Sequence, residues 1–198
     1  MIEIVSQVWI WHWFSQPHGY NFNGFFVAHP DGNLCIDPVE PPAAALDHMR
    51  EKGVGTIAIT NRNHVRAANR VREACNARTL IHAADAEYAR SQGAEIDGNL
   101  SVGNRVGPFV IVGVPGKSAG EVALHWPERR VLVVGDAVIG NPPGQCSLLR
   151  EKVLDDPPKL RQSIKVLLDL DFDTLLVGDG EPILKGAKDR LRELTERW

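Results

Sequence analysis

Hydrophobic and polar residues alternate with a period of two near the start of the chain. Trp9, Trp11 and Trp13 alternate with Ile10 and His12, which is the pattern of a β-strand. Short apolar runs predict further strands, at 2–4, 25–28, 34–36, 56–59, 79–81, 110–114, 121–125, 130–134 and 174–177. Apolar residues at helical spacing predict helices at 43–52, 65–77, 85–92, 158–168 and 185–197.

Segments rich in Gly, Pro and Asn separate these elements. They predict loops at 15–24, 30–33 and 141–144. The strands fall into two clusters, helices lie between and after them, and no linker or short-period repeat interrupts the chain. The pattern therefore predicts one α/β domain over 1–198, with two layers of sheet covered by helices.

Composition narrows the class of protein. Hydrophobic residues make up 43% of the chain and charged residues 24%, which excludes disorder. The net charge of −3 gives no reason to expect nucleic acid as a partner. The cysteines at 35, 75 and 146 form no paired motif, no signal peptide is apparent, and the longest apolar runs cannot span a bilayer. We expect a cytoplasmic protein that does not bind a membrane.

Four polar segments directly follow apolar strands, at 60–64, 115–118, 135–136 and 178–180. Polar side chains at strand ends are where sheet-based enzymes place their chemistry, although Gly and Asp also serve in ordinary turns. Gly116, Lys117 and Ser118 resemble the end of a phosphate-binding loop. Ile111 occupies the place of the required first glycine, and a strand follows instead of a helix, so we reject nucleotide binding.

Taken together, the four segments resemble the metallo-β-lactamase fold superfamily over nearly the whole chain. Segment 21–38 (NFNGFFVAHPDGNLCIDP) resembles its opening hairpin, 60–64 its H-x-H-x-D-H loop and 115–118 its P-G-H-[ST] loop. Segment 131–136 (VLVVGD) resembles the strand that leads to the bridging aspartate, and 175–182 (LLVGDGEP) resembles the closing G-H-G loop. The resemblance implies a four-layer αββα sandwich of two mixed sheets, with the site at one edge.

The resemblance also implies where metal ligands should stand. The family binds two metals through five histidines and two aspartates, and most of these positions differ here. With His64 as the last signature histidine, the positions carry Ile59, Asn61, Asn63, His64, Lys117, Asp136 and Asp179. A register shifted by two would instead place Asn61, Asn63, Val65 and Arg66 on the signature ligands, which leaves fewer strong ligands still.

One of the two family sites therefore retains no strong ligand. The other keeps His64, Asp136 and Asp179, a plausible set for a single Zn, Fe or Mn ion, with Asn63 able to add a carbonyl oxygen. The alternative is that no metal binds. Lys117 would then pair with Asp136 or Asp179 and replace the missing metal charge, which requires fewer assumptions.

Two functions remain open. The first is a hydrolase of an ester, thioester, amide or phosphoester, with Lys117, Asp136 and Asn63 as catalytic residues. The second is a metal-free descendant that binds a small molecule or a partner protein. Arg62 and Arg66 either hold an anionic substrate or neutralise Asp136 and Asp179, and His18 lies where the family shapes its substrate pocket. The tryptophan face is most simply core packing, or a homodimer surface if it is exposed. The substrate is not specified by the resemblance.

Overall fold

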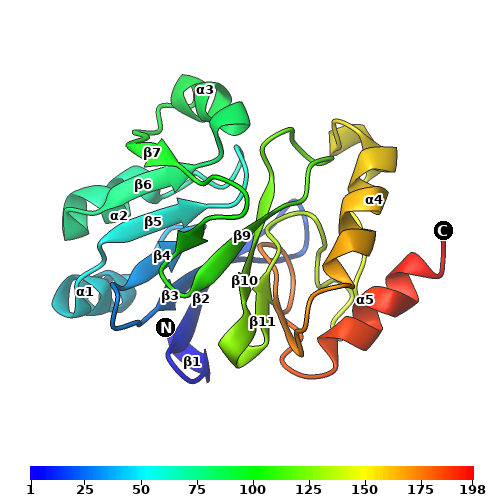
Figure 1. Cartoon of the computed structure of the whole chain (residues 1–198). Helices are drawn as coiled ribbons and strands as arrows, with labels where there is room; N and C mark the ends of the chain where they lie inside the picture. The colour runs from blue at the N-terminus through cyan, green and yellow to red at the C-terminus, as the bar shows by residue number, and fades with distance from the viewer.

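A computed structural model describes all residues from 1 to 198 and shows two sheets packed face to face, with helices on both outer faces (Figure 1). Helices α1, α2 and α3 cover the outer face of one sheet, and α4 and α5 cover the other. Both sheets contain parallel and antiparallel pairs. The four-layer αββα sandwich of two mixed sheets is confirmed.

The first sheet has seven strands in chain order. They are β1 (Ile2–Val5), β2 (Val8–Ser15), β3 (Tyr20–Val27), β4 (Leu34–Ile36), β5 (Thr56–Ile59), β6 (Arg78–Ile81) and β7 (Gly98–Asn99). Strands β1 to β4 pair antiparallel, and β4 to β7 pair parallel. The parallel strands need crossover connections, which are the helices α1 (Ala43–Lys52), α2 (Ala68–Cys75) and α3 (Ala83–Ser91).

The second sheet has five strands in the order β12-β11-β10-β9-β8. They are β8 (Arg105–Val106), β9 (Phe109–Gly113), β10 (Val122–Trp126), β11 (Val131–Val133) and β12 (Thr174–Leu176). Helix α4 (Pro157–Leu167) connects β11 to β12, and α5 (Ala187–Thr195) ends the fold. Short 3₁₀ turns lie at η1 (Pro127–Arg129) and η2 (Glu151–Val153).

Three apolar layers hold the sandwich together. Phe25 and Leu124 belong to the layer between the two sheets. Met49 packs between the first sheet and its helices, and Ile164 and Leu191 pack between the second sheet and α4 and α5. Because each sheet packs against the other sheet on one face and against helices on the other, its central strands are buried on both faces.

The tryptophan face of β2 points toward the helices. It is buried at Trp11 and exposed at Trp13. Trp11 is 2% exposed and its indole Nε1 donates a hydrogen bond to the Val39 carbonyl at 3.0 Å. Core packing is therefore confirmed for Trp11. Trp13, at the far end, is 46% exposed and packs against Phe22 on the neighbouring strand.

Two sequence predictions need correction, and two short strands were not predicted. The loop expected at 15–24 is wrong beyond residue 19, because β3 begins at Tyr20 and pairs with β2 over its whole length. Helix α2 is shorter than 65–77, because the chain forms turns until Ala67. Strands β7 and β8 were not expected, since two residues each are too few to give a periodic signal. No helix is both long and apolar enough to cross a bilayer.

Asn23 explains why a polar stretch folds as a strand, and it joins the first sheet to the loop after β12. It is fully buried, and its Nδ2 donates to the carbonyls of Val177 at 2.8 Å and Gly180 at 2.9 Å. Its Oδ1 lies 2.8 Å from Nδ1 of His12 on the paired strand. Backbone carbonyls from the distant loop thus satisfy the amide, which an isolated sequence pattern cannot show.

We expect Asn23→Ala to lower the free energy of unfolding by roughly 1–3 kcal/mol, because two buried carbonyls lose their donor. Urea denaturation measures the change. Asn21→Ala is the matched control on the same strand, since the Asn21 side chain is only half-buried, and its effect should stay within about 0.5 kcal/mol. Equal losses in the two variants would contradict the role assigned to Asn23.

Candidate functional site

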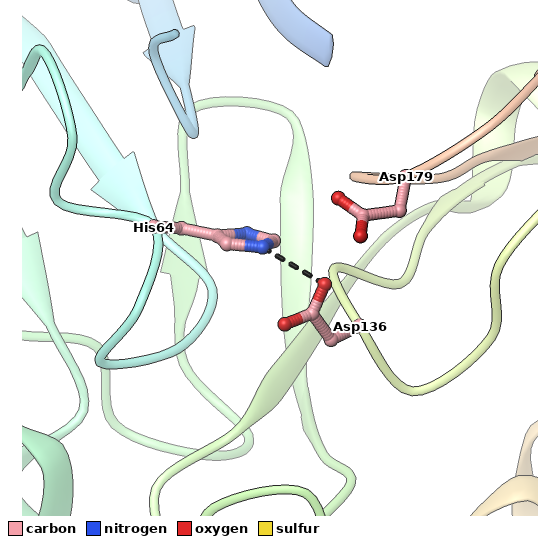
Figure 2. A group of neighbouring side chains, drawn as sticks. All are labelled: His64, Asp136 and Asp179. Carbon is pink, nitrogen blue, oxygen red and sulfur yellow. Dashed lines mark hydrogen bonds and ion pairs between the residues drawn. The ribbon is translucent and has the colours of Figure 1, made fainter. Parts of the chain in front are cut away.

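The polar segments predicted at strand ends meet at one edge of the sandwich. The loops after β5, β9, β11 and β12 supply His64, Lys117, Asp136 and Asp179 respectively. Potential ligand atoms of His64, Asp136 and Asp179 all lie within 4.8 Å of one another, and the three residues are buried. Figure 2 shows the three side chains converging from separate loops.

His64 bridges two carboxylates. Its Nδ1 lies 2.9 Å from Asp37 Oδ2, and its Nε2 lies 2.9 Å from Asp136 Oδ1. A ring that faces a carboxylate oxygen at each nitrogen donates from both, so His64 is an imidazolium. Burial alone would lower the pKa of His64, but the carboxylates of Asp136 and Asp37 outweigh it and raise the pKa to about 10.

Lys117 contacts the other carboxylate oxygen of Asp136. Its Nζ lies 3.4 Å from Asp136 Oδ2 and also donates a hydrogen bond to Asn63 Oδ1. Burial opposes ionisation of Asp136, yet the hydrogen bond and charge of His64, together with the Lys117 ammonium, hold the pKa of Asp136 below its usual range. Asp136 is therefore an ionised carboxylate between two cations.

Arg66 provides the third cation. Its guanidinium lies 3.5 Å from Asp179 Oδ1 and stacks over the Phe22 ring at 4.2 Å from the ring centre. That separation is long for a hydrogen bond, and Asp179 Oδ1 is buried without a hydrogen-bond partner. Burial and the nearby Asp136 charge raise the pKa of Asp179 to about 6. Burial and the same Asp179 raise the pKa of Tyr20 to about 12, so Tyr20 keeps its proton.

Glu121 is a site residue that the sequence analysis missed. It is 1% exposed, and its Oε1 accepts hydrogen bonds from the Asp136 backbone N–H at 3.0 Å and from Asn61 Nδ2 at 3.2 Å. Burial and the Asp136 charge raise the pKa of Glu121 well above its ordinary value, which keeps it neutral. A glutamate directly before the apolar strand β10 was the available signal.

Asp85 clamps two of the site loops together and was also missed. Its fully buried carboxylate accepts hydrogen bonds from the Arg62 N–H at 2.9 Å, the Gly120 N–H at 2.9 Å and the Ser118 hydroxyl at 2.5 Å. The loop after β5 and the loop after β9 are thus held by one side chain from α3. No sequence signal marked this role, because both partner loops lie far from Asp85 along the chain.

The three residues predicted to bind substrate, Arg62, Arg66 and His18, have different contacts. Arg62 pairs with Asp155 at 2.6 Å and stacks over Tyr88, so its expected alternative role of neutralising Asp136 or Asp179 is wrong. Arg66 takes that role for Asp179. His18 lies 2.7 Å from the Ser15 hydroxyl, with its ring against those of two neighbouring aromatic residues on β3.

A metal ion would have to compete with these contacts. His64 Nε2 and Asp136 Oδ1 face each other, Asp136 Oδ2 faces the Lys117 ammonium, and Asp179 Oδ1 faces Arg66. A histidine ligand must also be deprotonated at the bound nitrogen. The arrangement therefore does not fit a metal ion unless Lys117 moves and His64 loses a proton.

The geometry defines an αββα protein with a buried polar centre where strand-end loops meet. A family model described as the metallo-beta-lactamase superfamily matches residues 5–198. The chain belongs to the metallo-beta-lactamase superfamily. No match is found among curated proteins.

Solved structures share the fold at low sequence identity. The metallo-beta-lactamase from Pontibacter korlensis has a TM-score of 0.81 at 16% identity, and the match covers 100% of this chain and 98% of that chain. The metallo-beta-lactamase FIM-1 from Pseudomonas aeruginosa, in a mono-zinc form, has a TM-score of 0.78 at 16% identity, covering 98% and 93%. The protein TTHA1623, in a di-iron-bound form, has a TM-score of 0.70 at 25% identity, covering 91% and 98%.

The His64 imidazolium predicts a pH dependence of stability. The pKa of His64 is about 10 in the folded chain against 6.5 for an ordinary histidine, so the folded state holds an extra proton between these values. The contribution of His64 to stability is complete below about pH 6.5 and is lost as the pH rises toward 10. We expect the free energy of unfolding to fall between about pH 7 and 9, and His64→Asn to remove that part of the slope.

The control for this measurement is His82→Asn, because His82 contacts no carboxylate and accepts only a backbone hydrogen bond from Ala84. The control should keep the wild-type slope in denaturation series at several pH values. A wild-type slope no steeper than that of His64→Asn would show that His64 is not held as an imidazolium.

Asp85→Asn should lower the free energy of unfolding by roughly 3 kcal/mol, because the amide replaces an acceptor of three hydrogen bonds with one weaker acceptor and a misplaced donor. Glu87→Gln, on the exposed face of the same helix, is the matched control and should change stability by less than about 0.5 kcal/mol. Thermal and urea unfolding of both variants provide the test, and similar stabilities would refute the clamp.

Proposed function

We propose that this chain is a metal-independent member of the superfamily. In it, Lys117, His64 and Arg66 supply the positive charge at the centre, and the protein binds a small organic molecule. Under this proposal the metal centre is degraded. The catalytic roles expected for Lys117, Asp136 and Asn63 are then structural roles. The proposal takes the metal-free alternative of the sequence analysis.

The observation that carries the proposal is the environment of Asp136. One carboxylate oxygen lies 2.9 Å from His64 Nε2, and the other lies 3.4 Å from Lys117 Nζ. Asp136 is the aspartate that the resemblance places between two metals. Both its oxygens are in contact with cationic side chains, so a metal would have to displace a buried ion pair.

Charge balance supports the same conclusion. Three carboxylates, of Asp37, Asp136 and Asp179, each lie against at least one cation from His64, Lys117 or Arg66. Buried carboxylates need paired cations, or they must take up protons. Because side chains already meet this need, the centre can persist without a bound metal.

A mononuclear hydrolase is the second candidate, and one observation favours it. The ligand atoms of His64, Asp136 and Asp179 lie within 4.8 Å of one another, which is close enough to surround one ion. The solved mono-zinc and di-iron structures suggest one or two ions by likeness of fold. The donor set of this chain argues against transferring either, since an ammonium group binds no metal.

Elemental analysis and calorimetric titration with Zn²⁺, Mn²⁺ and Fe²⁺ distinguish the two candidates. We expect wild-type protein, purified without an affinity tag, to hold well under one metal ion per chain. Lys117→Met should raise the affinity for these ions by roughly tenfold or more, because it removes a positive charge 3.4 Å from Asp136.

Lys159→Met is the matched control, because Lys159 is an exposed lysine of α4 that forms no ion pair, and it should leave metal affinity unchanged. Lys117→Gln repeats the test if the methionine variant is unstable. About one tightly held ion per wild-type chain, lost in Asp136→Asn, would overturn the proposal and establish the mononuclear centre.

A further inference from the structure

A cavity of about 300 Å³ opens between the turn after β5, helix α2 and the end of α3. All its lining residues belong to segments 62–69 and 92–94, so the loops after β9, β11 and β12 do not contribute to it. Its volume lies at the lower end of the range of roughly 300–1,000 Å³ that is typical of small-molecule sites. The cavity is therefore separate from the polar centre and sized for a small molecule.

Hydrogen-bond donors line this cavity, and no aspartate or glutamate does. Asn63 Oδ1 accepts a hydrogen bond from Lys117, whereas Asn63 Nδ2 donates to no atom of the protein. Arg62 Nε is buried without a hydrogen-bond partner. Gln92 follows α3 directly, and its exposed side-chain amide makes no hydrogen bond. Each of these three side chains therefore has a donor available for a ligand.

Arg62 is a cation whose position is fixed before any ligand arrives. Its Nη2 lies 2.6 Å from Asp155 Oδ1, and its guanidinium stacks over the Tyr88 ring at 4.8 Å from the ring centre. Its backbone N–H donates to Asp85 Oδ2 at 2.9 Å. A guanidinium held in this way loses little conformational entropy on binding, because its side chain is already ordered.

Arg66 brings a second guanidinium to the same cavity. Its one carboxylate contact, with Asp179 Oδ1, is 3.5 Å long, so most of its five N–H donors are unused. Glu95 lies next to the lining segment 92–94, but it pairs with Arg72 at 3.3 Å. An anion in the cavity would thus meet two guanidinium groups, while the nearby carboxylates already have cationic partners.

We propose that this cavity binds a phosphate group. The inference rests on the proposed binding of a small molecule, and it names the site and the chemical class of the ligand. A tetrahedral phosphate presents oxygens in several directions, which suits donors that come from two separate segments, 62–66 and 92. A planar carboxylate has only two oxygens and would leave some of these donors unused. Arginine binds phosphate through charge-assisted, bidentate hydrogen bonds.

Calorimetric titration with inorganic phosphate and with phenyl phosphate tests the inference, on protein freed of metal by a chelating resin. We expect wild-type protein to bind both, with affinities that fall as salt is added. Phenyl phosphate should bind more tightly, because Val65 and Ala94 offer apolar contact to the ring. Tighter binding of phenyl phosphate assigns the site to a phosphorylated small molecule, and equal or weaker binding assigns it to free phosphate.

Arg62→Gln should weaken the binding of phenyl phosphate by roughly tenfold, because it removes one of the two guanidinium groups. Arg161→Gln is the matched control. Arg161 also pairs with a carboxylate, that of Glu151 at 2.8 Å, also stacks on an aromatic ring, that of Trp198, and also has a buried Nε without a partner. It lies outside the cavity, so this control should bind phenyl phosphate as the wild type does.

Gln92→Leu repeats the test without breaking an ion pair and should weaken binding by roughly threefold. Wild-type protein that binds neither compound would overturn the inference. So would an Arg62→Gln variant that binds phenyl phosphate as tightly as Arg161→Gln does. Metal content enters neither result, so failure here is distinct from failure of the metal-independent function.

Discussion

The contact of Asp136 with His64 and Lys117 is the interaction on which the site depends. A carboxylate that is 4% exposed is stable as an anion only if cations lie against it. His64 satisfies one oxygen and Lys117 the other. Each cation also binds a second group, Asp37 for His64 and Asn63 for Lys117, so the loops after β4, β5, β9 and β11 are linked through one carboxylate.

Two side chains outside this cluster, Asp85 and Asn23, also hold loops of the centre. Asp85 ties the Arg62 and Ser118 segments, and Asn23 ties β3 to the loop after β12. Both are buried polar groups, and nearby backbone groups satisfy them. Such networks fix loop geometry more narrowly than apolar contacts, because a shift leaves a buried donor or acceptor unpaired. The loops of the centre are thus held by ion pairs within the cluster and by hydrogen bonds from Asp85 and Asn23 outside it.

Sequence patterns predicted the sheets and helices well, because long periodic segments such as β2 and α1 bury alternate or helical faces. They failed for β3, where Asn23 looks like a loop residue until its distant carbonyl partners are known. Asp85 was missed for the same reason, whereas Glu121 stands directly before β10, a signal that went unused. The signature register is instructive too. In the register shifted by two, Asn63 and Arg66 occupy ligand positions, and the Asn63–Lys117 and Arg66–Asp179 contacts agree with that register. The His64–Asp136 contact agrees instead with the register in which His64 is the last signature histidine.

Three apolar layers hold the sandwich together, and one of them includes Ala137 and Val138 of the loop that carries Asp136. What a metal provides is positive charge among carboxylates, and side chains can provide the same. An arginine or lysine introduced alone at this centre would destabilise the protein, since an unpaired buried cation is as unfavourable as an unpaired carboxylate. The cations and carboxylates at this centre therefore form one set.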